Sequence, residues 1–323
     1  MFRKFLLFVF PAALLLTACG PAAIRTAQPL AKPASTQPLV VPTDPGSIDL
    51  TDGLGREVRL AAAAQRVVSL APSNTEILFA IGAGPQVVGR DELSDYPAQV
   101  SGIQSVGGSM GKFSTEAIVA LKPDLVLATG INPPELVKSL EGLGLTVYYL
   151  SNPTTLDEMY AELETVGQLT GHVEESKTLV QSLKARVSAV DAKLAGVSMK
   201  PSVFYELDAT DASKPYTAGP GTFIDTVIQE AGGVNVASTL KDQYPQISLE
   251  ELVLLNPDII VLSDSAYGIT PEMVAARAGW GTLAAVKNGK VYPFDYHLLS
   301  DPGPRLVDGL EQLAKLLHPE LFK

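Results

Sequence analysis

Two stretches of this chain, 134 residues apart, repeat one pattern of helix, turn and strand. The sequence TEAIVALKPDLVLAT at 115–129 aligns without gaps to LEELVLLNPDIIVLS at 249–263, with identical residues at five positions. Each copy predicts a short helix, a Pro-Asp turn and a buried strand rich in branched side chains. Because each half of the chain carries one copy, we expect two similar α/β lobes. A cleft between two such lobes is a preferred place for a small ligand.

The rest of the body alternates short β-rich runs with helical ones, which is typical of parallel sheets covered by helices. The alternating residues around an Asp-Gly pair at 48–60 predict a hairpin. We expect strands at 66–70, 86–89, 124–129 and 146–150, and again at 202–207, 258–263 and 291–294. We expect helices at 74–81, 115–121 and 134–142, and again at 222–231, 249–255, 271–278 and 304–317.

Between the two halves, apolar residues recur at helical spacing from Leu156 to Leu194. Gly167 and Gly171 punctuate this run, which therefore predicts a shorter helix to about residue 169 and a longer one at 172–195. At 1.5 Å per residue the longer helix would extend about 36 Å, a length that suits a strut between lobes. The predicted fold is α/β, with two parallel-sheet lobes joined by one long rigid helix and a ligand cleft between them.

The chain begins with the features of an export signal. Basic Arg3 and Lys4 precede an apolar run at 5–16 that is too short to span a bilayer. The run ends in Leu-Thr-Ala-Cys-Gly at 16–20, which resembles a bacterial lipobox and contains Cys19, the only cysteine. The resemblance implies that residues 1–18 are a signal peptide and that Cys19 is lipidated. An ordinary secretory signal is the alternative.

Residues 20–46 are rich in Pro, Ala, Ser and Thr and lack the apolar content of a core. With Cys19 they form a predicted tether, 19–46, that holds the body at the outer face of the cytoplasmic membrane, the periplasmic side in a Gram-negative cell. The body then divides into an N-terminal lobe at 47–154, linking helices at 155–196 and a C-terminal lobe at 197–323. We expect a monomer.

Composition excludes several function classes. Lys and Arg number 24 against 35 Asp and Glu, for a net charge of −11, which disfavours nucleic acid as a partner. One cysteine excludes an internal disulfide, and three histidines disfavour a resident metal site. Ser73 does not lie in a Gly-x-Ser-x-Gly elbow, and the chain lacks a Gly-x-Gly-x-x-Gly fingerprint. A hydrolase using Ser73 with His297 is therefore a remote alternative, and a surface adhesin is a further one.

Each repeat places a serine two residues before a glutamate. Ser114 and Ser248 are natural N-caps, which puts Glu116 and Glu250 at the second helical position. An acidic group there stabilises a helix through its dipole, and this effect alone would explain the two glutamates. The matched placement, one glutamate per lobe, also suits a partner that is itself two-fold symmetric.

The segment at 67–100, the repeat, the long helix and GPGTFIDTVIQEAGG at 219–233 together resemble the helical-backbone, class III substrate-binding proteins of ABC importers. The resemblance covers nearly all of 65–319 and is closest to the cobalamin-binding members. It implies a protein that captures cobalamin, a ferric siderophore or haem, performs no chemistry on it and holds no resident cofactor. It also implies delivery to a permease dimer with a cytoplasmic ATPase, whose arginines would meet Glu116 and Glu250.

Loops that follow the strands should line the cleft. The ligand-binding candidates are Tyr216, Tyr244, Ser73, Asn74, Tyr96, Met110, Phe113, Tyr296 and His297. By position, the resemblance matches Tyr216 and Tyr244 to cleft aromatics of cobalamin binders, whereas Leu93, Thr129 and Met110 stand where other aromatics would be.

Arginine is scarce in these loops, with Arg90 and Arg305 as the cleft candidates, and this disfavours a catecholate siderophore. Haem would use Tyr296, His297 or Met110 as an axial ligand. A corrinoid is therefore the expected ligand, with a ferric siderophore or haem as the alternatives.

Overall fold

The computed structural model describes residues 46–323, apart from the side chain of Met110. The predicted signal peptide, Cys19 and nearly all of the tether lie outside these residues. The described residues all belong to one compact unit. In the part that the structure describes, no helix combines the length and the apolar character needed to cross a membrane.

The first lobe is a parallel sheet preceded by a hairpin. Antiparallel β1 (Ile48–Thr51) and β2 (Glu57–Leu60) form the hairpin that the Asp-Gly turn predicts. Four parallel strands follow in the order β4-β3-β5-β6. Their bounds are Val67–Ser69 for β3, Val87–Arg90 for β4, Leu125–Ala128 for β5 and Val147–Tyr149 for β6. The helices of this lobe are α1 (Pro72–Ala80), α2 (Thr115–Ala120) and α3 (Pro134–Gly142).

The second lobe repeats this order with one short additional strand. Parallel β7 (Ser202–Asp208), β10 (Ile259–Leu262) and β11 (Val291–Pro293) correspond to β3, β5 and β6. Short β9 (Val234–Asn235) pairs in parallel with β7, as β4 does with β3, and β8 (Tyr216–Thr217) pairs antiparallel with β7. The helices are α6 (Phe223–Glu230), α7 (Leu249–Leu255), α8 (Pro271–Ala275), α9 (Ala284–Lys287), α10 (His297–Ser300) and α11 (Leu306–Leu317).

The repeat extends to the backbone of its turns. Lys122 and Asn256, at equivalent positions, are the two non-glycine residues of the described chain with positive φ, at 48° and 43°. The aspartate two residues after each of these positions binds the backbone beside the neighbouring strand of the sheet. Asp124 accepts the backbone amide of Arg66 at 2.9 Å, and Asp258 accepts that of Ser202 at 2.9 Å. The prediction of two similar lobes is confirmed.

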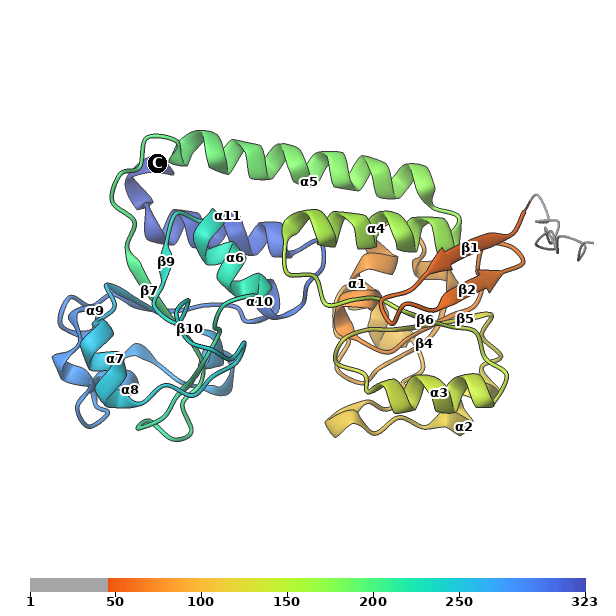
Figure 1. The fold of residues 1–323 in the computed structure, drawn as a ribbon, viewed down its shortest axis with the longest axis horizontal. Coiled ribbons are helices and arrows are strands. Elements are labelled where there is room, and N and C mark those ends of the chain that lie inside the picture. The colour runs from red at the N-terminus through yellow and green to blue at the C-terminus, as the bar shows by residue number, and fades with distance from the viewer. Residues whose placement is uncertain (1–45) are drawn as a thin grey trace, which may run out of the picture. The chain divides into compact units, whose positions relative to one another are not determined.

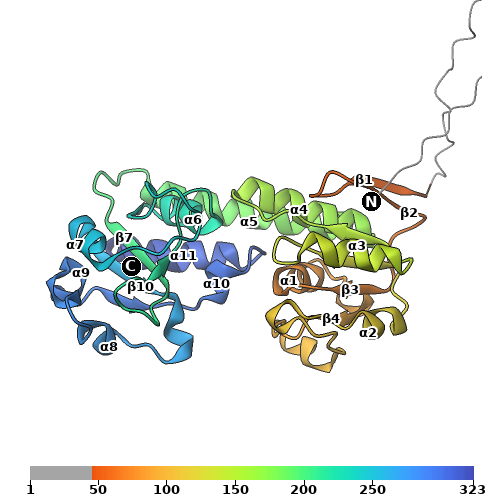
Figure 2. The ribbon, with the colours of Figure 1, turned by 60° about the horizontal axis from the view of Figure 1, so that its bottom comes forward.

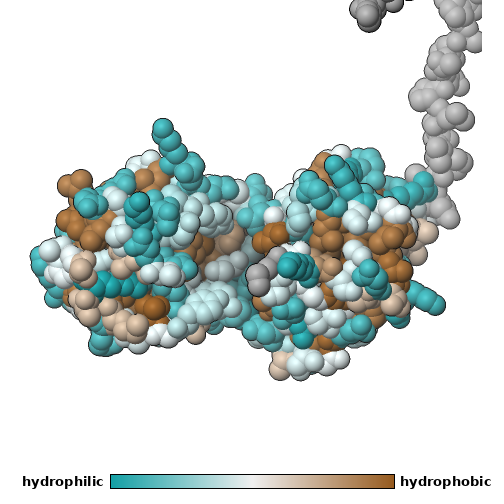
Figure 3. Space-filling view, turned by 90° about the horizontal axis from the view of Figure 1, so that it is seen from below, coloured by the Kyte–Doolittle hydropathy of each residue, from teal (hydrophilic) through white to brown (hydrophobic). Residues whose placement is uncertain are grey.

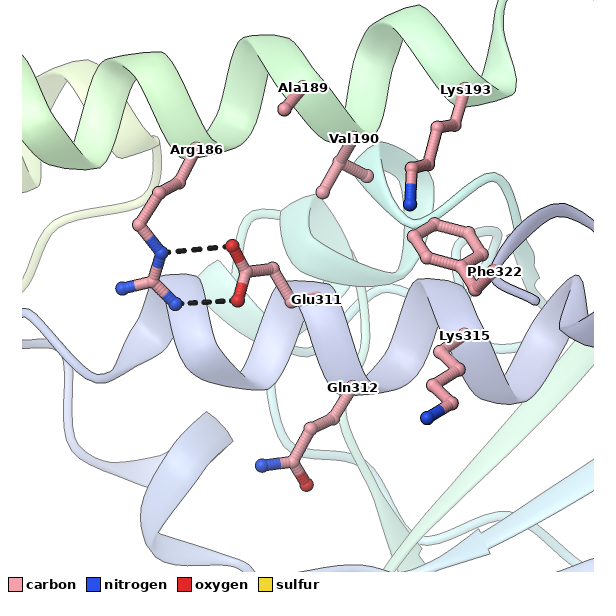
Figure 4. Close-up of a pocket in the computed structure, with 8 residues that line it drawn as sticks. All are labelled: Arg186, Ala189, Val190, Lys193, Glu311, Gln312, Lys315 and Phe322. Atoms are coloured by element: carbon pink, nitrogen blue, oxygen red, sulfur yellow. Dashed lines mark hydrogen bonds and ion pairs between the residues drawn. The ribbon is translucent and has the colours of Figure 1, made fainter.

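Two helices link the lobes, as the apolar spacing predicts. The N-terminus of α4 (Leu156–Thr170) has a capping box between Thr155 and Glu158, and its C-terminus ends at left-handed Gly171. The second helix, α5 (Val173–Leu194), has 22 residues and runs along α4 in one lobe and α11 in the other (Figures 1 and 2). Arg186 of α5 donates to Glu311 of α11 at 2.9 and 2.6 Å (Figure 4).

One apolar core continues from the first lobe into the second. It includes Val67 of β3, Leu163 of α4, Leu183 of α5 and Leu310 of α11, all with at most 3% of their surface exposed. Smaller clusters lie on the other face of each sheet. The lobes therefore share packing across α4, α5 and α11, which opposes bending between them.

Candidate functional site

The carboxyl ends of the parallel strands carry the loops that meet between the lobes. In the first lobe these loops follow β4, β5 and β6, and in the second they follow β10 and β11. His297 Nε2, after β11, lies 3.6 Å from Asp95 Oδ2, after β4. Thr226 Oγ1 of α6 donates to the carbonyl of Thr154, after β6, at 2.7 Å. Seen from the side away from α5, the surface is hollowed between the lobes (Figure 3).

Both lobes carry exposed tyrosines in the segments near their strand ends. Tyr96 of the first lobe and Tyr216 and Tyr244 of the second expose 47%, 44% and 44% of their surface. Tyr216 lies on β8, whose pairing with Asp208 sets it at the carboxyl end of β7. Burial raises the pKa of Tyr244, so its phenol stays protonated at neutral pH. Each ring offers a flat apolar face with one polar end.

A second aromatic group follows β10 and β11. The rings of Tyr267 and Tyr296 are stacked with centroids 6.1 Å apart, and the ring of His297 lies 3.9 Å from that of Tyr296. Burial, followed by the nearness of Tyr267 and Asp301, raises the pKa of Tyr296 to about 12. His297 faces a carboxylate on each side, with Nδ1 3.0 Å from Asp301 Oδ2 and Nε2 near Asp95. Nδ1 is therefore within hydrogen-bond distance of Asp301, whereas Nε2 only lies near Asp95.

Of the two candidate cleft arginines, Arg90 is half-buried and donates to the carbonyl of Asp91 at 2.8 Å, and Arg305 is neutralised by an ion pair. Arg305, the N-cap residue of α11, forms a two-pronged ion pair with Glu76 of α1, with a contact of 2.9 Å from Nε. Its guanidinium also lies 4.0 Å from the centre of the Tyr96 ring. Burial raises the pKa of Glu76, although Arg305 acts in the opposite direction. The pair joins the two lobes and adds no net positive charge for an anionic ligand.

Two hollows of similar size lie near α5. One, of about 360 Å³, is lined by Phe79 of α1, Tyr96, Leu183 and Arg305 and so adjoins the cleft. The other, of about 370 Å³, lies between α5 and α11 and contains Lys193 over the Phe322 ring at 4.3 Å (Figure 4). The second hollow lies away from the strand ends, so we do not assign it to the ligand.

The structure corrects one of the ligand-binding candidates and leaves others with small exposed surfaces. Asn74 is 1% exposed and donates to the carbonyl of Leu127 at 3.1 Å, so the expectation that it faces a ligand is wrong. Ser73 is 6% exposed. Phe113 is half-buried and packs against the core of the first lobe. The side chain of Met110 is outside the described part of the chain.

Asp91 is a positioning residue that the sequence analysis did not single out. Its Oδ1 accepts the backbone amides of Leu93 and Ser94 at 2.8 and 3.0 Å, and it is 2% exposed. The hydroxyl of Ser94 contacts that of Thr75 on α1 at 2.8 Å. These hydrogen bonds fix the loop that carries Tyr96. An Asp whose side chain bonds amides two and three residues later is a recognisable turn signal.

The paired glutamates occupy matching positions on α2 and α7. Ser114 and Ser248 cap these helices by accepting the amides of Ala117 and Glu251, so Glu116 and Glu250 stand second in each. Both glutamates are exposed, and neither forms an ion pair within residues 46–323. In Figure 1 both helices lie on the side of their lobe away from α5.

Residues 67–296 match the family model described as periplasmic binding protein. The chain belongs to this family. The uncharacterized ABC transporter substrate-binding lipoprotein YvrC of Bacillus subtilis (strain 168) is 31% identical to it over 279 residues, which is 85% of this chain and 87% of YvrC.

Two solved structures have the same fold. The periplasmic vitamin B12 binding protein BtuF of Vibrio cholerae is 30% identical with a TM-score of 0.68, covering 80% of this chain and 98% of its own. The periplasmic heme-binding protein RhuT from Roseiflexus sp. RS-1 in apo form is 25% identical with a TM-score of 0.72, covering 80% and 100%. The two-lobed α/β fold and the resemblance to substrate-binding proteins are thus confirmed. The chain is a binding protein and not an enzyme, which removes the hydrolase alternative with Ser73 and His297.

Proposed function

We propose that this protein is the lipid-anchored, extracytoplasmic substrate-binding component of an ABC importer and that it captures cobalamin between its lobes. Cys19 would carry the lipid, and residues 20–46 would tether the body to the membrane. The name of YvrC, an ABC transporter substrate-binding lipoprotein, supports the lipid anchor and the role in an importer. The name of BtuF, a vitamin B12 binding protein, supports cobalamin as the ligand.

The observation that carries the ligand assignment is the set of exposed tyrosines from both lobes, together with the pairing of Arg305 inside the protein. Tyr96, Tyr216 and Tyr244 offer flat faces to a large planar ring. Arg305 is already bound to Glu76. The corrin ring of cobalamin carries neutral amides on its edge, whereas haem carries two carboxylates and catecholate siderophores are strongly anionic. An aromatic cleft whose Arg305 is already paired suits the amide-edged ring best.

A haem cargo is the second candidate, since a stacked tyrosine pair stands beside His297. Haem ligation by the His297 ring would require it to leave Asp95 or Asp301. Equilibrium dialysis against cyanocobalamin, haemin and a ferric hydroxamate, read by absorbance, separates the candidates. We expect retention of cyanocobalamin alone at one molecule per chain. Retention of haemin with a Soret shift, and none of cobalamin, would replace the ligand and keep the fold and the docking assignment.

Delivery would use Glu116 and Glu250 to dock on a permease dimer that works with a cytoplasmic ATPase. Exposed ion pairs are each worth about 0.2–1 kcal/mol, but they steer encounter and fix orientation. Weak, orienting contacts suit a receptor that must dock and then leave. The variant with Glu116→Ala and Glu250→Ala should abolish uptake with unchanged ligand affinity, and normal uptake by this variant would refute the docking assignment.

A further inference from the structure

Five positions are identical in the two copies of the repeated segment, and one of them, Leu121 with Leu255, is half-buried in the first copy. Pro123 and Pro257 shape the turn, and Asp124 and Asp258 bind the backbone of the neighbouring strand. These identities are explained by the fold itself. Two further identities are exposed in both copies and have no such role: the glutamates Glu116 and Glu250, and the valines Val119 and Val253.

The valine follows the glutamate by three residues in each helix. Residues three apart on a helix lie on one face, so each lobe presents a carboxylate with an apolar group one turn away. Val119 is 39% exposed and Val253 is 38% exposed, which is nearly the same fraction in the two lobes. The next position of this face is also exposed and apolar, namely Ala120 in α2 and Leu254, 85% exposed, in α7.

Single exposed apolar residues are ordinary on protein surfaces and need no explanation. Here, however, the apolar residue recurs beside an unpaired carboxylate at equivalent places of the two lobes. Neither the helix dipole nor the core requires valine at an exposed position. The repetition therefore points to a partner that contacts both lobes with two equivalent surfaces.

We propose that Val119 and Val253, with Leu254 beside the latter, form the apolar half of the docking surface, each next to its glutamate. The occupant is the permease dimer, each subunit of which would present a cationic side chain beside an apolar socket. This inference rests on the proposed docking through Glu116 and Glu250. Charge complementarity selects the partner, since two exposed carboxylates call for basic groups, and the two-fold repetition calls for a dimer.

The two halves of the surface should respond differently to salt. The glutamate contacts are screened at high ionic strength, whereas burial of the valines is not weakened in this way. Glutamate would guide the approach and valine would lengthen the residence on the permease, because rim charges act mainly on the association rate.

The test compares full-length variants for binding to the source organism's permease–ATPase complex reconstituted in lipid nanodiscs. The variant with Val119→Ser and Val253→Ser should bind about tenfold more weakly, and the factor should persist from low to high salt. The matched control is Val234→Ser, since Val234 is 46% exposed on β9, outside the repeat. The control should bind like the unchanged protein. Ligand affinity and melting temperature, measured for every variant, should not change.

A second variant, with Val119→Thr and Val253→Thr, keeps the β-branched shape, and we expect a smaller loss than with serine. Unchanged binding by the serine variant, while the Glu116→Ala, Glu250→Ala variant loses binding, would overturn this inference alone. Unchanged binding by both variants would overturn the docking assignment as well. If the valine substitutions instead abolish self-association in sedimentation and leave permease binding intact, the surface belongs to a second copy and the proposal is wrong.

Discussion

The ion pair between Glu76 and Arg305 joins helices that are 229 residues apart in the chain, and its removal should be costly. The Glu76 side chain is 3% exposed and that of Arg305 is 15% exposed. Replacing Glu76 by Leu leaves a guanidinium in a largely buried place without its partner. Breaking such a pair from one side costs about 3–5 kcal/mol.

At a shift of about 2–4 °C per kcal/mol, a loss of about 3 kcal/mol lowers the melting temperature by about 6–12 °C. Arg305→Met should have a similar effect, since it leaves the Glu76 carboxylate buried. The double variant, Glu76→Leu with Arg305→Met, replaces both charges by apolar groups and should lie within about 1 kcal/mol of the unchanged protein. Urea and thermal unfolding followed by circular dichroism measure all three.

Glu164→Leu is the matched control, because Glu164 is exposed on α4. It should change stability by less than about 0.5 kcal/mol. If the losses of the two single variants add in the double variant, the pair is not coupled and the reasoning from its burial is refuted. A Glu76→Leu variant that is as stable as the control would also refute the reasoning from burial.

Three further predictions concern the ligand, pH and motion. Tyr216→Ala and Tyr244→Ala should each weaken cobalamin binding about tenfold by calorimetry, and unchanged affinities in both would move the ligand elsewhere. Burial and the nearby Glu206 raise the pKa of Asp264 to about 7, although Arg277 acts in the opposite direction. At Asp264 the folded state therefore binds more protons than the unfolded state between about pH 4 and 7, so the contribution of this group to stability should fall as pH rises through this window. Asp264→Asn should flatten that slope in unfolding experiments, whereas a slope equal to that of the unchanged protein would contradict the assignment. Ligand binding should leave the radius of gyration nearly unchanged in solution scattering, because α5 and the shared core link the lobes; a large compaction would contradict a rigid link.

Local patterns were enough to predict much of the fold. The spacing of Leu156 to Leu194 predicts both linking helices, since a 3.6-residue period is a property of the segment itself. The repeat predicts two lobes because each copy is a complete local pattern of helix, turn and strand. Two-residue strands β8 and β9 were not predicted, because they exist only through pairing with β7. The helix predicted at 271–278 ends at Ala275, before the left-handed Gly279.

Side-chain direction in the site was harder to predict. The helix expected to begin at residue 74 begins at Pro72, and Asn74 lies inside it with its amide on the Leu127 carbonyl. The partner of Arg305 could not be predicted, because Glu76 reaches it only through the tertiary fold. The positions of Glu116 and Glu250 were easier to predict, because a serine cap fixes the position of the second helical residue.

Isothermal titration of the full-length protein with cyanocobalamin tests the central claim most directly. We predict saturable binding of one cobalamin per chain, with submicromolar affinity and weaker binding in the Tyr216→Ala variant. No heat with cyanocobalamin at any concentration up to the millimolar range, for protein that melts cooperatively, would contradict the assignment of this cleft to cobalamin.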